Sequence, residues 1–304
     1  MKLTINTPAK INLGLWILGK REDGFHELET LFQMVSLYDT LDFDTECDGL
    51  TLTCNRSEIP TDESNLVMRA ALGLQKLFPD RTDLHCRIHL EKKIPSGAGL
   101  GGGSGNAAGT LLALNYLWDL GLTHDELQPL AAELGSDVPF FLVGPTAIGK
   151  GRGEVLTRIK PCPKFQVLLL TPHLSVSTAE VYKRLNLKLT STQNNIKILS
   201  KIFSKADIDS LGGHLHNDLE PVVLERFKEV KVVWEHLKAQ NARGVLVSGS
   251  GSTVFGIFSD SRQAKQAEAQ SFAEDWNTYL AETVSNVSEF LPESVLNYPQ
   301  AIRP

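Results

Sequence analysis

Six glycines crowd into the nine positions from Gly97 to Gly105, and no other stretch constrains the fold as strongly. Glycine adopts positive φ and leaves room for a ligand to approach the backbone. The run that follows, residues 106–120, predicts an amphipathic helix that ends at Gly121, because its apolar residues recur three or four positions apart. A glycine loop that leads into a helix presents free N–H groups and the positive end of the helix dipole. We therefore predict a phosphate-binding loop.

Three alternatives for glycine-rich stretches fit less well. A flexible linker rarely runs straight into an apolar helix. Residues 97–102 match the dinucleotide pattern G-x-G-x-x-G, but that pattern needs a strand after its helix, and Thr123 begins another predicted helix here. Residues 144–151 nearly form a Walker A loop, but Gly151 replaces the serine or threonine that would hold Mg²⁺. Their apolar character favours a hairpin turn in a core sheet.

Composition limits the classes of protein that remain. The 304 residues have room for two domains, which we place at residues 1–157 and 158–304, near the Pro161–Pro163 segment. A net charge of −6 argues against a nucleic-acid-binding surface. The N-terminal residues lack a signal peptide or membrane span, so we expect a cytoplasmic protein. Four scattered cysteines predict buried reduced thiols and no zinc site: Cys47, Cys54, Cys86 and Cys162.

Periodicity predicts a mixed α and β fold. Strands are expected at residues 9–18, 29–35, around 41–43, 50–54, 84–90, 165–170, 244–247 and 254–258. Helices are expected from Asn65 to about residue 77, from Thr123 to Leu134, after Ser177, from 217 to 237 and over 261–274. The tail from Ser285 gives no clear pattern.

Two charged residues stand out within these elements. Lys10 and Asn12 share one face of the strand at residues 9–18, either as a solvated edge or as functional groups. Asp137 directly precedes an apolar run, which is the usual place of a helix cap. The residues alone leave both alternatives open.

Three motifs in order resemble those of the GHMP kinases, a superfamily that includes galactose, homoserine, mevalonate and phosphomevalonate kinases. They are PAKINLGL at 8–15, PSGAGLGGGS at 95–104 and VSGSGSTVF at 247–255. Further segments resemble the branch whose acceptor is a cytidine-diphosphate-linked methylerythritol, used in non-mevalonate isoprenoid synthesis: 19–28, 65–67, 135–141 and 217–220. One departure is the pair Gly105-Asn106, where the superfamily commonly carries an aspartate.

The resemblance implies an α+β fold of two lobes, with a nucleotide-binding N-terminal lobe, a ferredoxin-like C-terminal lobe and the active site in the cleft. It implies transfer of the ATP γ-phosphoryl group to the 2-hydroxyl of the acceptor. Asp137 would take the hydroxyl proton, and Lys10 would lie beside it and offset developing negative charge. Mg²⁺ would arrive with ATP, and no protein ligand is assigned to it.

Binding roles follow from the same resemblance. ATP would be held by Pro95, Ser96, Gly97, Ala98, Gly99, Leu100, Gly101, Gly102, Gly103, Ser104 and Gly105, with Asn65 near the adenine. Phe25 and Tyr182 would sandwich the cytosine, His26 would read its edge, Asn12 would orient the acceptor, and Phe32 would form a pocket wall. For isolated aromatic residues, core packing is the ordinary alternative.

Other functions are kept as alternatives. These are another small-molecule GHMP kinase, a non-catalytic relative that only binds a ligand, and an NAD(P)-dependent enzyme resting on the weak dinucleotide pattern. The oligomeric state is not determined by the sequence.

Overall fold

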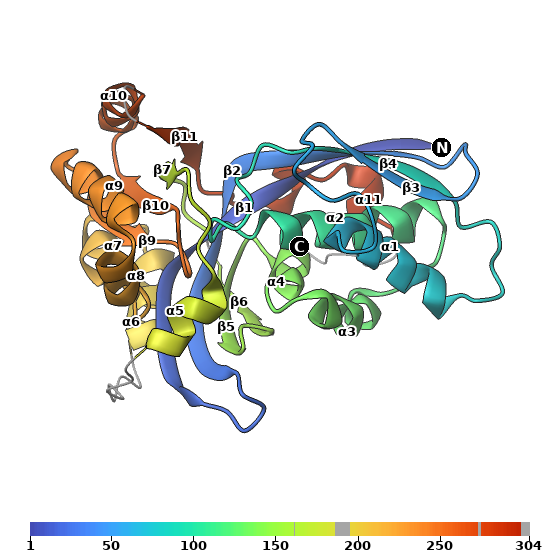
Figure 1. Ribbon diagram of the computed structural model, residues 1–304, viewed down its shortest axis with the longest axis horizontal. Helices are drawn as coiled ribbons and strands as arrows, with labels where there is room; N and C mark the ends of the chain where they lie inside the picture. The colour runs from blue at the N-terminus through green and yellow to red at the C-terminus, as the bar shows by residue number, and fades with distance from the viewer. Residues whose placement is uncertain (161, 186–194, 273–274, 299–304) are drawn as a thin grey trace.

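The computed structural model describes residues 1–160, 162–185, 195–272 and 275–298 (Figure 1). Its strands are β1 (Lys2–Lys20), β2 (His26–Asp44), β3 (Leu50–Cys54), β4 (Cys86–Glu91), β5 (Thr146–Gly151), β6 (Val155–Arg158), β7 (Gln166–Pro172), β8 (His216–Asn217), β9 (Gly244–Val247), β10 (Val254–Phe258) and β11 (Trp276–Glu282). Its helices are α1 (Leu66–Leu77), α2 (Gly102–Leu117), α3 (His124–Leu134), α4 (Val138–Val143), α5 (Thr178–Arg184), α6 (Asn195–Ser204), α7 (Ile208–His214), α8 (Glu220–Arg226), α9 (Lys228–Ala239), α10 (Ser261–Ser271), the 3₁₀ helix η1 (Val287–Glu289) and α11 (Glu293–Leu296).

The first sheet is built around two long antiparallel strands. Its path is β3-β4-β2-β1-β8, and β5 also pairs with β2 and with β6. Both β1 and β2 are 19 residues long, and in Figure 1 they run from the first lobe to the second. The sequence predicts two strands where β2 is continuous, because the polar residues around Tyr38 read as a break. The pairing with β1 shifts register between Pro8 and Ala9 and carries β2 through that break.

Helices α1 to α4 cover one face of this sheet and share its core. Apolar side chains of β2 and β4 pack there with those of α1 and α2, among them Leu41, Ile88, Leu74 and Leu111. The C-terminal tail joins the same core through Val284, Phe290 and Val295, although its sequence shows no pattern. Residues 284–296 therefore return to the first lobe from beyond β11, so a single cut near residue 157 does not describe the packing.

The second lobe is a four-stranded antiparallel sheet with the order β11-β7-β10-β9. Its elements follow the β-α-β-β-α-β order of a ferredoxin-like fold: β7, the helices α5 to α9, β9, β10, α10 and β11. One face packs against α9 and α10, and the other meets β1, β2, α6 and α7. The predicted two-lobed α+β architecture is confirmed. Of the predicted boundary at 161–163, residue 161 lies outside the described residues.

Several local predictions were wrong for tertiary reasons. The helix predicted over 217–237 is split into α8 and α9 at Phe227, whose backbone is extended and whose ring packs on the second-lobe core. The hairpin turn predicted within 144–151 is the strand β5, and the turn follows it at 152–154. Helix α10 ends at Ser271, and residues 273–274 of that prediction lie outside the described part.

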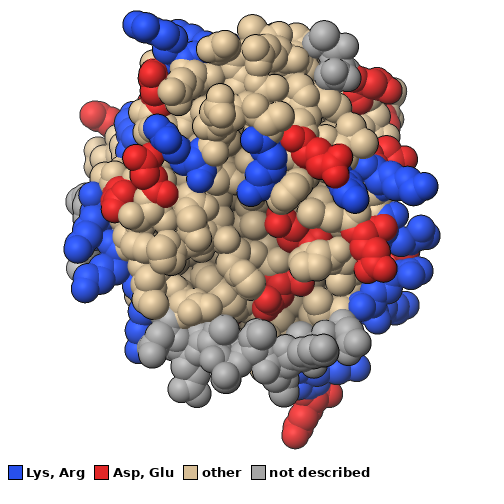
Figure 2. All heavy atoms as spheres, turned by 90° about the vertical axis from the view of Figure 1, so that its left-hand side faces the viewer, with Lys and Arg blue, Asp and Glu red and all other residues tan. Residues whose placement is uncertain are grey.

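Cys86 is buried, but the other three cysteines are only partly buried, and all four are free thiols. On the face formed by the second lobe, acidic and basic side chains are interspersed around an uncharged centre (Figure 2). Among the described residues, no helix combines the length and apolar character needed to cross a membrane.

Candidate active site

Lys10 lies on β1 and is buried. Its side chain is 5 % exposed, so the solvated-edge interpretation was wrong. Lys10 Nζ donates to Asn12 Oδ1 at 2.8 Å, and Asn12 Nδ2 donates to Thr30 Oγ1 at 2.8 Å. Thr30 Oγ1 in turn donates to the carbonyl of Gly14 at 2.7 Å. This chain of hydrogen bonds fixes the ammonium group and both ends of the Asn12 amide.

Asp137 faces Lys10 across the site. Its Oδ2 atom lies 3.5 Å from Lys10 Nζ, and its side chain is 33 % exposed. Asp137 holds the N-cap position of α4, yet within the described residues its side chain makes no capping hydrogen bond. Asp137 therefore occupies the predicted cap position, but its side chain does not cap the helix. A buried cation thus faces a carboxylate that a ligand in solution can reach.

The glycine loop is held from both lobes. Lys10 N–H donates to the carbonyl of Leu100 at 2.9 Å, which ties the loop to β1. On the second-lobe side, Thr253 N–H donates to the carbonyl of Ala98 at 3.1 Å, and Ser248 Oγ donates to that of Gly99 at 2.9 Å. A Cβ on Gly99 would lie 2.1 Å from the Ser248 carbonyl oxygen. The second and third sequence motifs therefore form one pair of touching loops.

The α2 helix begins four residues before the predicted start, at Gly102. Gly103, Ser104 and Gly105 thus lie in its first turn, directly after the left-handed residue Gly101. Gly105 packs against the Pro8 carbonyl, since a Cβ there would lie 3.0 Å from that oxygen. This close approach of helix and strand lets the helix extend backward despite the low helix propensity of glycine.

Asn106, the residue that departs from the superfamily pattern, is a buried residue of α2. Its Oδ1 atom accepts a hydrogen bond from Thr7 Oγ1 at 2.7 Å. The side chain therefore fastens α2 to β1, and it does not line either of the two cavities that border the glycine loop within the described residues.

The segment from Asn217 to Glu220 holds the third-motif loop against the site. Asn217 Nδ2 donates to the carbonyls of Val247 and Gly249, both at 2.8 Å. Glu220 Oε2 accepts from Val247 N–H at 2.8 Å, and burial raises the pKa of this carboxyl. Asp218 accepts from the Ile17 N–H of β1 at 2.7 Å. The sequence singled out this segment by resemblance alone, and its contacts give it a positioning role.

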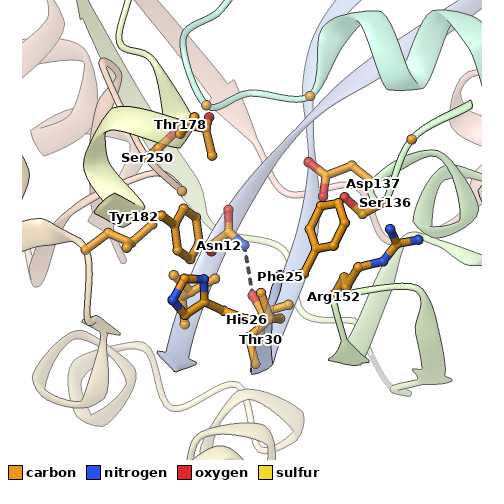
Figure 3. A pocket seen from close by; sticks show the side chains of 18 of the residues that line it. Asn12, Phe25, His26, Thr30, Ser136, Asp137, Arg152, Thr178, Tyr182 and Ser250 are labelled. Atoms are coloured by element: carbon orange, nitrogen blue, oxygen red, sulfur yellow. Dashed lines mark hydrogen bonds between the residues drawn. The ribbon is translucent and has the colours of Figure 1, made fainter. Parts of the chain in front are cut away.

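A cavity of about 1060 Å³ lies between the lobes. Both lobes contribute to its wall, as Figure 3 shows for Asp137 on one side and Thr178, Tyr182 and Ser250 on the other. Residues 97, 99, 101 and 104 of the glycine loop border it, whereas residues 95, 96 and 98 border a second cavity of about 500 Å³. The loop is therefore a wall shared by two cavities. The cationic side chains that line the large cavity are Lys10, Lys20, Arg152 and Lys183.

The aromatic residues of the large cavity each contact a neighbouring side chain. His26 contacts Tyr182, with ring centroids 4.8 Å apart, while Phe25 lies under the Arg152 guanidinium at 4.7 Å. Phe25 is 53 % exposed and lies across the cavity from Tyr182 (Figure 3). Burial, with the nearby Lys20 charge, lowers the pKa of His26, and burial raises the pKa of Tyr182 to about 12. Both side chains are therefore neutral near pH 7.

Two other predicted residues have mainly structural contacts. Phe32 lines the cavity but is 2 % exposed, and it stacks on Phe140 at 4.8 Å between centroids. Asn65 caps α1: its Oδ1 accepts from Val67 N–H at 2.9 Å, and its Nδ2 donates to the Pro60 carbonyl. Among the two cavities bordered by described residues, Asn65 lines neither.

Sequence reasoning missed several wall residues. Ser136, Arg152, Thr178 and Ser250 all border the cavity, and Thr178 Oγ1 lies 2.8 Å from Ser250 Oγ. Ser136 and Ser250 stand inside recognised motifs, which was an available signal. Arg152 and Thr178 stand outside them, so only the fold brings them to the site.

Comparison with known proteins identifies the family. Residues 65–145 match the model of the GHMP kinases N-terminal domain, and residues 199–277 match that of the GHMP kinases C-terminal domain. The chain belongs to the GHMP kinase family. A 4-diphosphocytidyl-2-C-methyl-D-erythritol kinase from Geobacter sp. (strain M21) is 44 % identical over 270 residues, which is 88 % of this chain and 94 % of that protein.

Further relatives point the same way. A protein of the same name from Syntrophotalea carbinolica is 43 % identical over 92 % of this chain and 98 % of its own length. A crystal structure of 4-(cytidine 5'-diphospho)-2C-methyl-D-erythritol kinase matches with a TM-score of 0.81 at 34 % identity, covering 93 % of this chain and all of that one. A homoserine kinase from Cytophaga hutchinsonii, 20 % identical over 94 % of this chain and 95 % of that one, shares the fold with a TM-score of 0.73.

Proposed function

We propose that this chain transfers the γ-phosphoryl group of ATP to the 2-hydroxyl of 4-diphosphocytidyl-2-C-methyl-D-erythritol, a step in isoprenoid precursor synthesis. The observation that carries the proposal is the Lys10–Asp137 pair, 3.5 Å apart, in the wall of a cavity that the glycine loop also borders. A base, a cation and a phosphate-binding loop at one cavity are what phosphoryl transfer to an alcohol requires.

The chemistry needs one proton transfer and one displacement. Asp137 takes the proton as the hydroxyl oxygen attacks the γ-phosphorus, an oxygen–phosphorus bond forms, and the bond to the β-phosphate oxygen breaks to release ADP. Lys10, held by Asn12, offsets negative charge on the transferred group. The N–H groups between Gly97 and Ser104, with the N-terminal turn of α2, hold the phosphates.

Mg²⁺ arrives with ATP in this proposal. Among the described residues there is no cluster of three or more histidine, cysteine, aspartate or glutamate side chains that could hold a metal. Asp137 is the one carboxylate in the described wall of the large cavity. Phosphate oxygens and water would then supply most ligands of the ion, which would neutralise charge on the phosphates, and no protein ligand is assigned.

The acceptor lies across the large cavity. Phe25 offers an exposed aromatic face for the cytosine, with Tyr182 on the opposite wall and His26 beside it as a neutral hydrogen-bonding group. Arg152 lies over the Phe25 ring and Lys183 follows Tyr182 in the chain, and because both line the cavity they suit the diphosphate. Use of ATP supports a cytoplasmic location.

ADP release tests the proposal directly. The purified chain is incubated with Mg²⁺-ATP and, in separate reactions, with the cytidyl methylerythritol substrate, mevalonate, homoserine or galactose. We expect rapid ADP release only in the reaction that contains the cytidyl methylerythritol substrate. Preferential turnover of another acceptor would support a different GHMP kinase, and ATP binding without turnover of any acceptor would support a non-catalytic relative.

A further inference from the structure

A buried ion pair outside the large cavity lies under the glycine loop. Asp39, on β2, is fully buried, and Lys92, directly after β4, is 6 % exposed. Lys92 Nζ lies 2.6 Å from Asp39 Oδ2. Burying both charges carries a desolvation cost that apolar side chains would avoid, so stability alone does not explain the pair.

Asp39 and Lys92 form hydrogen bonds to the backbone of the segment that leads into the glycine loop. Asp39 Oδ1 accepts from the N–H groups of Lys93 at 2.7 Å and Ile94 at 2.8 Å. Lys92 Nζ also donates to the Ile94 carbonyl at 2.5 Å. Residues 92–94, which immediately precede Pro95, are therefore fixed by four hydrogen bonds to or from these two side chains.

The same ammonium group touches the point where the loop ends. A Cβ on Gly102, the first residue of α2, would lie 2.9 Å from Lys92 Nζ. Lys92 thus contacts both the entry of the loop, at Ile94, and its exit, at Gly102. The residues between these two points include the positive-φ glycines Gly97, Gly99 and Gly101, whose conformational freedom must be limited from outside.

We propose that Asp39 and Lys92 are positioning residues that hold the two ends of the glycine loop at a fixed separation, and so set the geometry of its phosphate-binding N–H groups. The inference rests on the proposed placement of ATP at this loop. Lys92 also brings a positive charge to the N-terminus of α2, where it adds to the field that attracts phosphate. Neither side chain borders the large cavity, so neither touches the acceptor, whereas Lys92 borders the second cavity.

Three variants separate positioning from stability. Lys92→Met keeps the aliphatic stem and removes the charge, Asp39→Asn keeps an acceptor for the two N–H groups, and the double variant leaves no uncompensated buried charge. Lys150→Met is the control for loss of a lysine paired with an acidic residue of β2: its Nζ lies 2.9 Å from Glu29, its side chain is more exposed, and it borders neither of the two cavities.

Binding of a non-hydrolysable ATP analogue is measured by calorimetry, together with thermal unfolding and the KM for each substrate. The double variant is expected to regain most of the thermal stability that Lys92→Met loses, yet to bind the analogue about tenfold or more weakly than the original chain. KM for ATP should rise in parallel, with KM for the acceptor within about twofold and the control unchanged. A tenfold loss of analogue affinity is of the size usually measured for the interaction energy between residues in contact.

A double variant that folds and binds the analogue within about twofold of the original affinity would overturn the inference, because the pair would then serve stability alone. If Lys92→Met does not fold, analogue binding by the double variant still distinguishes positioning of the loop from a role in stability alone. The analogue measurement needs no acceptor, so a failure of the proposed acceptor chemistry leaves this result readable and is seen separately as absent ADP release.

Discussion

Lys10 Nζ lies 3.5 Å from Asp137 Oδ2, although the two residues come from β1 and from the start of α4. The lysine is buried and hydrogen-bonded to Asn12, whereas the carboxylate is one-third exposed to the cavity. Because their exposures differ, the Lys10 ammonium group and the Asp137 carboxylate can have different roles. Lys10 is a fixed cation, and Asp137 is the group that an acceptor hydroxyl can reach.

Replacing Asp137 by asparagine should stop proton transfer and leave the fold intact. The turnover number is expected to fall by about a hundredfold or more, with ATP binding nearly unchanged, because the amide is isosteric but cannot accept the proton. ADP release at saturating substrates measures the effect. Asp125→Asn, at a fully exposed position on α3, is the control that should keep normal turnover. Near-normal turnover in Asp137→Asn would show that another group is the base.

Phe25→Ala should weaken binding of the acceptor. Loss of one aromatic stacking partner costs on the order of 1–3 kcal/mol per base, so KM for the cytidyl substrate should rise by roughly tenfold while KM for ATP stays constant. Competition by cytidine nucleotides gives an independent reading. Phe272→Ala removes another exposed ring on the second lobe, 65 % exposed, and should change neither constant. Unchanged competition in Phe25→Ala would remove the stacking role.

Two glycines of the same loop should respond oppositely to alanine. Gly99 has a φ of 78°, and its Cβ would lie 2.1 Å from a carbonyl oxygen of the third-motif loop, so Gly99→Ala should cost more than about 2 kcal/mol of stability. Gly103 lies inside α2, and its Cβ would meet only Leu66 at 3.6 Å. Gly103→Ala should add about 0.5–1 kcal/mol through helix propensity. Thermal unfolding of both variants tests the contrast, and equal effects would contradict the close packing of the two loops.

Stability should fall in mild acid through His26. Burial lowers its pKa in the folded chain below the ordinary value of 6.5, so the unfolded chain binds a proton more readily. The contribution of neutral His26 is therefore present above about pH 6.5 and is lost as the pH falls below it. His26→Gln should reduce the loss of thermal stability between about pH 7.5 and pH 5.5 relative to the original chain. Parallel losses in the two proteins would show that His26 does not contribute.

The sequence predicted local elements best where a single physical signal dominated. The side chain of Asn65 caps α1, and a capping box at Thr123 begins α3, as the residues alone indicate. Strands β9 and β10 have the predicted bounds. In contrast, the start of α2 was predicted four residues late, because glycine disfavours helix and only packing on Pro8 and Ile94 overrides that preference.

The residues of the site also fall into two groups, those that the sequence identified and those that only the fold brings together. Motif order identified the glycine loop, Lys10 and Asp137 as members of one site, but periodicity could not exclude an edge lysine or a helix cap. Arg152 is absent from every sequence argument, since its approach to Phe25 depends on the pairing of β2 with β5. The stacking of cytosine between Phe25 and Tyr182 stays a prediction, and the contact of His26 with Tyr182 depends on side-chain directions that the sequence does not give.

The sequence by itself determined the glycine loop, the helix that follows it and the family, because these depend on residue types at fixed short spacings. Only the tertiary structure decided that Lys10 is buried beside Asp137, that the 217–220 segment holds the third-motif loop, and that Asp39 and Lys92 hold both ends of the glycine loop. Such contacts join segments far apart in the chain. Their formation depends on the register of β1 with β2 and on the docking of the two lobes, which no local spacing encodes.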